Sequence, residues 1–194
     1  MAEAVAPTTA ERVRAAALSL FAERGYHGTG IRQLADAAGL SSASLYHYMG
    51  TKEELLVAIM RTSLTRLVDA GEEICADPAL TARERLVALV EMHVRTHARS
   101  PEETRVVDDE VRALSATSRG EIVALRDRYE DLWQATIDEG VRSGSFRVET
   151  PALARRALLE MCSGVARWWV PSGPLSLDEL ADEYATMAVH LVRA

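Results

Sequence analysis

The chain has 194 residues, of which 48% are hydrophobic and 26% are charged, a composition typical of soluble globular proteins with one or two domains. No run of about 18 apolar residues occurs, which argues against a transmembrane helix and a membrane partner. Residues Met1 to Ala10 lack the basic and apolar segments of a secretory signal, and Cys75 and Cys162 lie outside any metal-ligand spacing. We therefore expect a cytoplasmic protein with reduced cysteines.

The net charge of −7 is unevenly distributed along the chain. Residues 1–52 carry a balance of +1, and the remaining residues carry −8. Because binding to DNA depends on the cations that face phosphate, and not on the total charge, a near-neutral N-terminal part can still bind a duplex. The acidic remainder predicts weak affinity for non-specific DNA.

Helical periodicity dominates the N-terminal part of the chain, and alternating strand patterns are absent. The apolar spacing predicts a first helix over Thr9–Arg24 and a second over Ile31–Ala38, for which Thr29 is the expected N-cap. A third short helix ends near Tyr48, and glycines follow all three.

The rest of the chain is also helical in pattern. Capping boxes at Thr51–Glu54 and Thr81–Glu84 begin two helices, the first of which runs to about Cys75. Four more are expected after Ser100-Pro101, over Ser118–Val141, from Pro151 through Trp169, and over Leu177–Val192. The predicted fold class is all-α with about nine helices: a three-helix helix-turn-helix DNA-binding domain over 1–52 and a helical ligand-binding and dimerisation domain over 53–194.

The second and third helices have the features of a helix-turn-helix. Two short helices can cross closely when a small residue stands at the contact and a glycine makes a left-handed turn, which are the roles of Ala35 and Gly39. Three leucines fill the wedge between the helices: Leu34, Leu40 and Leu45. This set at this spacing favours a DNA-binding unit over a structural helical hairpin.

The second helix of such a unit lies in the major groove, where hydroxyls, an imidazole and a methyl group can contact bases and phosphates. The residues that we assign to DNA binding are Thr29, Arg32, Ser41, Ser42, Ala43, Ser44, Tyr46, His47, Tyr48 and Lys52. Packing against the first helix is the alternative role for Tyr48. No Lys or Arg lies in the reading helix, so specificity is expected to depend on helix placement and groove shape.

From Glu11 to Leu56 the chain resembles the DNA-binding domain of the TetR family. The resemblance is carried by Phe21-Ala-Glu-Arg-Gly-Tyr-His-Gly-Thr29, by Ile31 through Tyr48 and by Thr51-Lys52-Glu53. It implies nine helices, a ligand cavity in the body, repression as the usual mode, and a homodimer on near-palindromic operator DNA. For the dimer contacts we assign Leu158, Cys162, Trp169, Tyr184, Met187 and Leu191.

The C-terminal part is similar to TetR-family repressors of fatty-acid and sterol-ring catabolism that respond to acyl-CoA thioesters. The similarity is carried by Arg128-Tyr129, Trp133, Gly140, Gly144-Ser-Phe-Arg147 and Val165 through Leu175. It implies an apolar tunnel for the acyl part and cations for the phosphates. Our ligand-binding candidates are Leu89, Val90, His93, His97, Asp109, Arg128, Tyr129, Trp133, Met161, Val165 and Trp168, with Arg119, Arg126 and Arg167 as further phosphate partners.

Several alternatives remain open at this stage. The expected effector is a small hydrophobic molecule, either an acyl-CoA or a ligand of the multidrug kind. For each candidate ligand-binding residue, the alternative is an ordinary role in the core or at the solvent-exposed surface. His93 and His97 have the spacing of a metal site, but a core or pocket role is commoner on an apolar stripe, so no metal and no cofactor is expected. The absence of catalytic motifs argues against an enzyme, and the hydroxyl-rich helix argues against a protein-binding adaptor.

Overall fold

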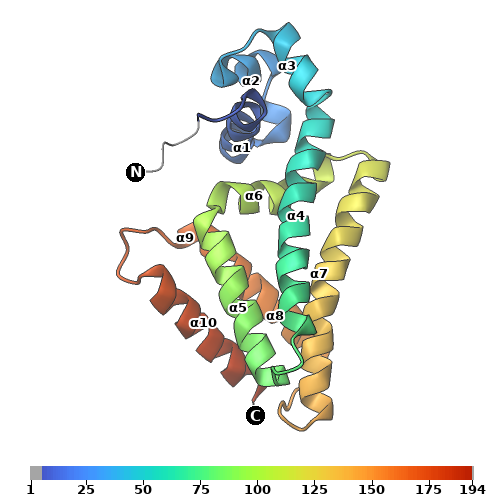
Figure 1. The fold of residues 1–194 in the computed structure, drawn as a ribbon, viewed down its shortest axis with the longest axis vertical. Helices are drawn as coiled ribbons and strands as arrows, with labels where there is room; N and C mark the ends of the chain where they lie inside the picture. The colour runs from blue at the N-terminus through green and yellow to red at the C-terminus, as the bar shows by residue number, and fades with distance from the viewer. Residues whose placement is uncertain (1–5, 194) are drawn as a thin grey trace.

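The computed structural model describes residues 6–193, and within this range the chain forms helices and loops and no strand (Figure 1). The elements in chain order are α1 Thr9–Gly28, α2 Ile31–Ala38, α3 Ser42–Met49, α4 Lys52–Ala76, α5 Ala82–Arg99, α6 Pro101–Asp109, the 3₁₀ turn η1 Glu110–Ala113, α7 Ala116–Arg142, α8 Pro151–Ser163, α9 Val165–Trp168 and α10 Leu177–Val192. The predicted all-α fold class is confirmed.

One predicted helix is interrupted. The pattern from Pro151 through Trp169 predicts a single helix, whereas α8 ends at Ser163 and the short α9 begins after Gly164. The apolar spacing continues across the break because only one residue separates the two segments. Periodicity alone therefore could not reveal it.

The N-terminal head consists of α1, α2 and α3 (Figure 1). Gly25 adopts a positive φ of 74°, so regular helix ends near Arg24, as predicted, and one further turn leads towards α2. Phe21, Leu34 and Leu45 are at most 2% exposed and form the centre of the head. Burying each of these side chains contributes about 1.5–3 kcal/mol, and together they fix α3 against α1 and α2.

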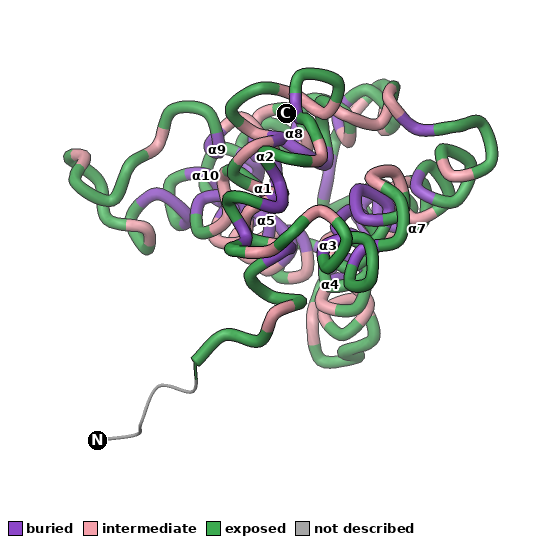
Figure 2. The backbone as a smooth tube through the Cα atoms, turned by 90° about the horizontal axis from the view of Figure 1, so that it is seen from above, coloured by how far each residue is buried: buried purple, intermediate pink, exposed green. Residues whose placement is uncertain are grey.

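Two long helices, α4 and α7, lie side by side through the body, and α5 packs against both of them and against α10 (Figure 1). Leu86, Leu89, Trp133 and Ile137 are fully buried where these helices meet. Seen from above, buried stretches lie along the helices, and the loops at the edges of the molecule are mostly exposed (Figure 2). The body core is therefore built mainly between α4, α5, α7 and α10.

The short helix α6 lies between head and body and contacts α1, α4 and α9 (Figure 1). Val106 and Val107 on α6 are buried in the same apolar cluster as Phe21 of the head. Ile122 of α7 belongs to this cluster too. The apolar core of the head thus continues past residue 52 into α6 and α7. A displacement of α6 would therefore change its packing against α1.

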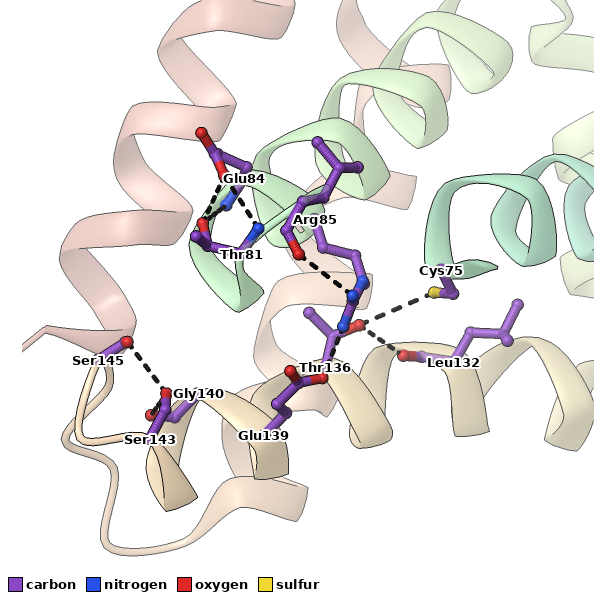
Figure 3. A network of polar contacts seen from close by, with 11 residues as sticks. Cys75, Thr81, Glu84, Arg85, Leu132, Thr136, Glu139, Gly140, Ser143 and Ser145 are labelled. Carbon is purple, nitrogen blue, oxygen red and sulfur yellow. Dashed lines mark hydrogen bonds and ion pairs between the residues drawn. The ribbon is translucent and has the colours of Figure 1, made fainter. Parts of the chain in front are cut away.

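The opposite end of the body is held by polar contacts (Figure 3). Arg85 on α5 donates to a Glu139 carboxylate oxygen on α7 at 2.6 Å and to the Leu80 carbonyl at 3.3 Å. Thr136 donates to the Leu132 carbonyl at 2.9 Å, and its Oγ1 lies 3.9 Å from Cys75 Sγ at the end of α4. This network ties α4, α5 and α7 together far from the head.

Candidate DNA-binding interface and effector cavity

The turn between α2 and α3 has the predicted geometry. Gly39 adopts the left-handed conformation (φ 68°, ψ 40°), a region that favours glycine, and the Leu40 amide donates to the Ala35 carbonyl at 2.9 Å. Leu34 and Ala35 are 1% exposed and Leu45 is fully buried. The close crossing of the two helices therefore depends on the residues that the sequence singles out.

The outer face of α3 is available to a partner. Ser41 caps the helix by accepting a hydrogen bond from the Ser44 amide at 3.1 Å, and the two serine hydroxyls are 2.9 Å apart. Tyr46 and Tyr48 are about half exposed, at 51% and 49%, so part of each ring is open to a partner. The remaining exposed or half-buried residues of this face are Ser42, Ala43 and His47, with Arg32 exposed on α2.

Thr29 does not present its side chain to a partner. It is 1% exposed, and its hydroxyl donates to the Gly25 carbonyl at 2.9 Å and the Leu20 carbonyl at 3.2 Å. The sequence predicts Thr29 as the N-cap of α2, but the N-cap in the structure is Gly30. The Thr29 hydroxyl is used to satisfy carbonyls at the end of α1, which leaves it unable to reach phosphate.

Lys52 is also turned inward. Its ammonium donates to the carbonyls of Tyr26 and Thr29, both at 2.8 Å, and lies 4.1 Å from the centre of the Tyr26 ring. Partial burial lowers the pKa of Lys52. An ammonium at the carbonyl end of a helix is well placed electrostatically. Lys52 therefore fastens the start of α4 to the end of α1, and its effect on DNA binding is expected to pass through the position of the head.

The body contains a cavity of about 390 Å³. Its walls come from α4 to α9, and its lining includes four of the predicted ligand residues: His93, His97, Asp109 and Tyr129. Lining residues that the sequence reasoning missed include Leu64, Glu103, Leu159, Glu160 and Ser163. Glu103, Leu159 and Ser163 come from α6 and α8, whose facing could not be assigned from single-helix patterns.

Two stacked histidines form one wall of the cavity. The ring centres of His93 and His97 are 3.8 Å apart with 13° between the planes. His93 Nδ1 lies 2.9 Å from the Tyr129 hydroxyl, His93 Nε2 lies 3.1 Å from Ser163 Oγ, and His97 Nδ1 donates to the His93 carbonyl at 2.9 Å. Burial places the pKa of His93 well below its ordinary value and lowers that of His97 to about 4. Both rings are therefore neutral near pH 7.

The other predicted ligand residues lie outside the lining. Leu89, Val90, Trp133 and Val165 are fully buried in the body core, where they shape the cavity only indirectly, and Met161 packs at the edge of that core. Trp168 is 54% exposed. Arg128 pairs with Glu72 at 2.6 Å. Their apolar spacing marks the buried face of a helix, but it does not distinguish a packed core from a cavity wall.

Two of the candidate phosphate partners do line the cavity. Arg126 pairs with Asp108 at 3.2 Å, and Arg167 pairs with Asp109 at 2.7 Å. Arg119 donates instead to the carbonyls of Arg112 and Leu114. A phosphate at Arg126 or Arg167 must therefore compete with a carboxylate already in place.

The predicted dimer residues divide into two groups. Leu158 and Cys162 are fully buried within the protomer, and Tyr184 is 9% exposed, so these side chains form internal packing. Trp169 is half-buried and donates to the Leu175 carbonyl at 3.2 Å. Met187 and Leu191 are each 42% exposed on α10, one turn apart. Of the six predicted residues, only these last two are large apolar side chains that stay exposed.

Among residues 6–193, no three His, Cys, Asp or Glu side chains lie close enough to hold a metal ion. Over the same range no helix is both long and apolar enough to cross a membrane.

Comparison with known proteins gives the family. Residues 13–59 match the family described as "Bacterial regulatory proteins, tetR family", and residues 79–192 match "Tetracyclin repressor-like, C-terminal domain". The chain belongs to the TetR family. It is therefore a DNA-binding transcriptional regulator and not an enzyme, which confirms the resemblance inferred from the helix-turn-helix.

Three relatives extend the comparison. The HTH-type transcriptional repressor KstR2 of Rhodococcus jostii is 35% identical over 175 residues, which are 89% of this chain and 85% of the relative. The structure of the ketosteroid transcriptional regulator KstR2 of Mycobacterium tuberculosis superposes with a TM-score of 0.88 at 25% identity, covering 97% of both chains. AibR, solved in complex with isovaleryl coenzyme A and operator DNA, superposes with a TM-score of 0.83 at 26% identity, covering 93% of this chain and 97% of AibR.

Proposed function

We propose that this TetR-family regulator is a homodimeric repressor that leaves its operator when a small effector, an acyl-CoA thioester, occupies the body cavity. The observation that carries the proposal is that α6 forms a wall of the cavity and also contacts α1 of the head. The likeness to AibR, a protein solved with isovaleryl coenzyme A and operator DNA, supports the effector class.

The coupling is concentrated at Glu103 on α6. Its side chain is 10% exposed, lines the cavity, and pairs with Arg14 of α1 and with Arg66 of α4, the latter at 2.6 Å. A ligand that displaces α6 must therefore move or break contacts to the head and to the helix that supports it. The effector and the operator DNA then favour different arrangements of the head. By linkage, binding of either one lowers the affinity for the other.

The cavity suits the acyl end of a thioester better than the whole molecule. A volume of about 390 Å³ lies at the lower end of ligand sites and is too small for a complete coenzyme A. Its lining is polar as well as apolar, with Arg126 and Arg167 paired to aspartates. In this proposal the nucleotide part lies outside the cavity. Its phosphates replace Asp108 and Asp109 as the partners of these two arginines.

The DNA contact is assigned to the exposed face of α3. In a symmetric dimer the two α3 helices would enter successive major grooves about 34 Å apart on a near-palindromic operator. Met187 and Leu191 on α10, with the exposed Leu153 on α8, supply apolar surface for the dimer. A change in the distance between the two heads would then be enough to lower operator affinity.

The decisive experiment starts from an operator selected out of random duplex DNA with the full-length protein. Operator binding is followed by fluorescence anisotropy while acyl-CoA thioesters, the matching free acids and unrelated hydrophobic drugs are added. We expect release by thioesters of short or medium chain length. Release by the drugs or free acids alone would overturn the effector class, and a monomer on the operator would overturn the dimer.

A matched pair of variants tests the coupling and the interface separately. Arg14→Gln removes the cation that pairs with Glu103 while leaving the cavity lining intact, and it should reduce the effect of the ligand on operator affinity several-fold. Tyr46→Ala changes only the exposed face of α3 and should weaken operator binding without changing ligand affinity. Equal ligand responses in wild type and Arg14→Gln would show that α6 acts by another route.

A further inference from the structure

The histidine wall of the cavity has a defined direction of hydrogen bonding. Tyr129 is 5% exposed, and within residues 6–193 the one acceptor within hydrogen-bond distance of its hydroxyl is His93 Nδ1, at 2.9 Å. A buried hydroxyl proton without an acceptor costs about 1–3 kcal/mol, so Tyr129 donates to Nδ1. Since His93 is neutral, its proton is on Nε2.

The direction set by Tyr129 fixes the role of Ser163. His93 Nε2 donates to Ser163 Oγ at 3.1 Å, so the serine oxygen acts as the acceptor. The hydroxyl proton of Ser163 has no acceptor among the described residues, and Ser163 lines the cavity. The chain of hydrogen bonds from Tyr129 through His93 therefore ends at the Ser163 hydroxyl, a donor that lines the cavity.

His97, whose ring stacks on that of His93, supplies an acceptor to the same cavity. Its Nδ1 must carry the proton, because a backbone carbonyl can only accept and Nδ1 lies 2.9 Å from the His93 carbonyl. The lone pair on Nε2 is then free to accept, and no group of residues 6–193 donates to it. His97 is 5% exposed and lines the same cavity. His97 Nε2 is thus an acceptor at the cavity wall with no donor among residues 6–193.

We propose that the cavity recognises a hydroxyl group on its effector, which accepts from Ser163 and donates to His97 Nε2. A hydroxyl is a small group that accepts and donates at one atom, as this pairing requires. The inference rests on the proposed effector cavity and specifies the ligand class as hydroxylated, whether the hydroxyl is carried by an acyl chain or by a ring. An effector without it leaves both groups to water or unpaired.

The first test needs no knowledge of the effector. NMR of protein labelled with ¹⁵N-histidine should show two neutral rings at pH 7, with the proton on Nε2 of His93 and on Nδ1 of His97. Titration with cyclohexanol should shift the Nε2 resonance of His97, whereas methylcyclohexane, of similar size, should not. The reverse tautomers, or equal responses to both probes, would overturn the inference.

The second test measures selectivity with chain-matched thioesters. Two neutral hydrogen bonds predict that 3-hydroxyhexanoyl-CoA binds about 10- to 100-fold more tightly than hexanoyl-CoA in calorimetric titration. Ser163→Ala and His97→Leu should reduce this preference to a few-fold, while His97→Gln, which keeps an acceptor, should retain most of it. Equal affinities in the wild type overturn the hydroxyl site while leaving the acyl-CoA proposal standing. If neither thioester binds, the acyl-CoA proposal fails and the cyclohexanol titration decides the hydroxyl site.

Discussion

Acidification from pH 7 to pH 5 should destabilise this protein through His97. His97 is 5% exposed, and burial lowers its folded-state pKa to about 4 from its ordinary value of 6.5. Between these two values the unfolded chain binds a proton that the folded chain does not. By linkage the free energy of unfolding therefore falls as the pH drops from about 6.5 towards 4, and it is insensitive to this group above 6.5.

The size of the effect follows from the two pKa values. At pH 5 the unfolded histidine is almost fully protonated and the folded one is almost fully neutral, so His97 alone costs about 2 kcal/mol relative to pH 7. At pH 4 and below the loss approaches about 3 kcal/mol. His93, which stacks on His97, adds to the loss in the same direction because burial also lowers its pKa.

Urea unfolding followed by circular dichroism at pH 7 and pH 5, at one fixed protein concentration, measures this difference. His97→Gln is the matched control because it removes the titrating group and keeps an acceptor. Asp108 and the neighbouring His93 are present in both proteins, so their contributions to the pH dependence largely cancel. We expect wild type to lose about 2 kcal/mol more than the variant between the two pH values. An equal loss in both proteins would refute the assignment of a neutral, buried His97.

The remaining predictions concern packing and the attachment of the head. A Cβ at Gly140 of α7 would lie 2.0 Å from the buried Phe146 ring, so Gly140→Ala should lower the free energy of unfolding by about 1–3 kcal/mol in urea unfolding. A Cβ at Gly120 in the same helix meets nothing within 4 Å, so Gly120→Ala should raise the free energy of unfolding by up to about 1 kcal/mol. Comparable shifts in the two variants would contradict the packing argument. Lys52→Met removes two hydrogen bonds to the end of α1 and should weaken operator binding, with faster amide exchange confined to the head. Weakened binding with unchanged exchange would instead point to direct phosphate contact.

The sequence was sufficient for the helix-turn-helix because its geometry is local. Ala35, Gly39 and Leu45 act within a span of eleven residues, and each needs only its own turn or contact to be recognised. The exposed face of α3 follows from the same periodicity. Thr29 was misplaced because an extended hydroxyl residue before a helix resembles an N-cap, whereas its hydroxyl is taken by carbonyls of α1.

The cavity could not be predicted to the same depth because it is made by residues far apart in sequence. Trp133 and Tyr129 lie on one face of α7, yet Trp133 fills the core and only Tyr129 borders the cavity. That distinction depends on where α5 and α8 cross α7, which no single helix encodes. Glu103 and Ser163 were missed for the same reason, since a carboxylate and a hydroxyl on short helices read as solvent-facing until their partners are known.

The inward positions of Lys52 and Arg14 change the expected basis of DNA binding. The first 52 residues carry a balance of only +1, and two of their five cations are used within the protein, Lys52 at the end of α1 and Arg14 at Glu103. Since affinity for phosphate depends on the cations left to face it, one head alone should bind DNA weakly. We therefore expect tight binding to require both heads of the dimer at the correct separation. Arg14, one of the few cations of the head, pairs with Glu103 of the cavity lining, so its position depends on that of α6. In the proposed mechanism, we therefore expect a modest displacement of α6 to release the operator.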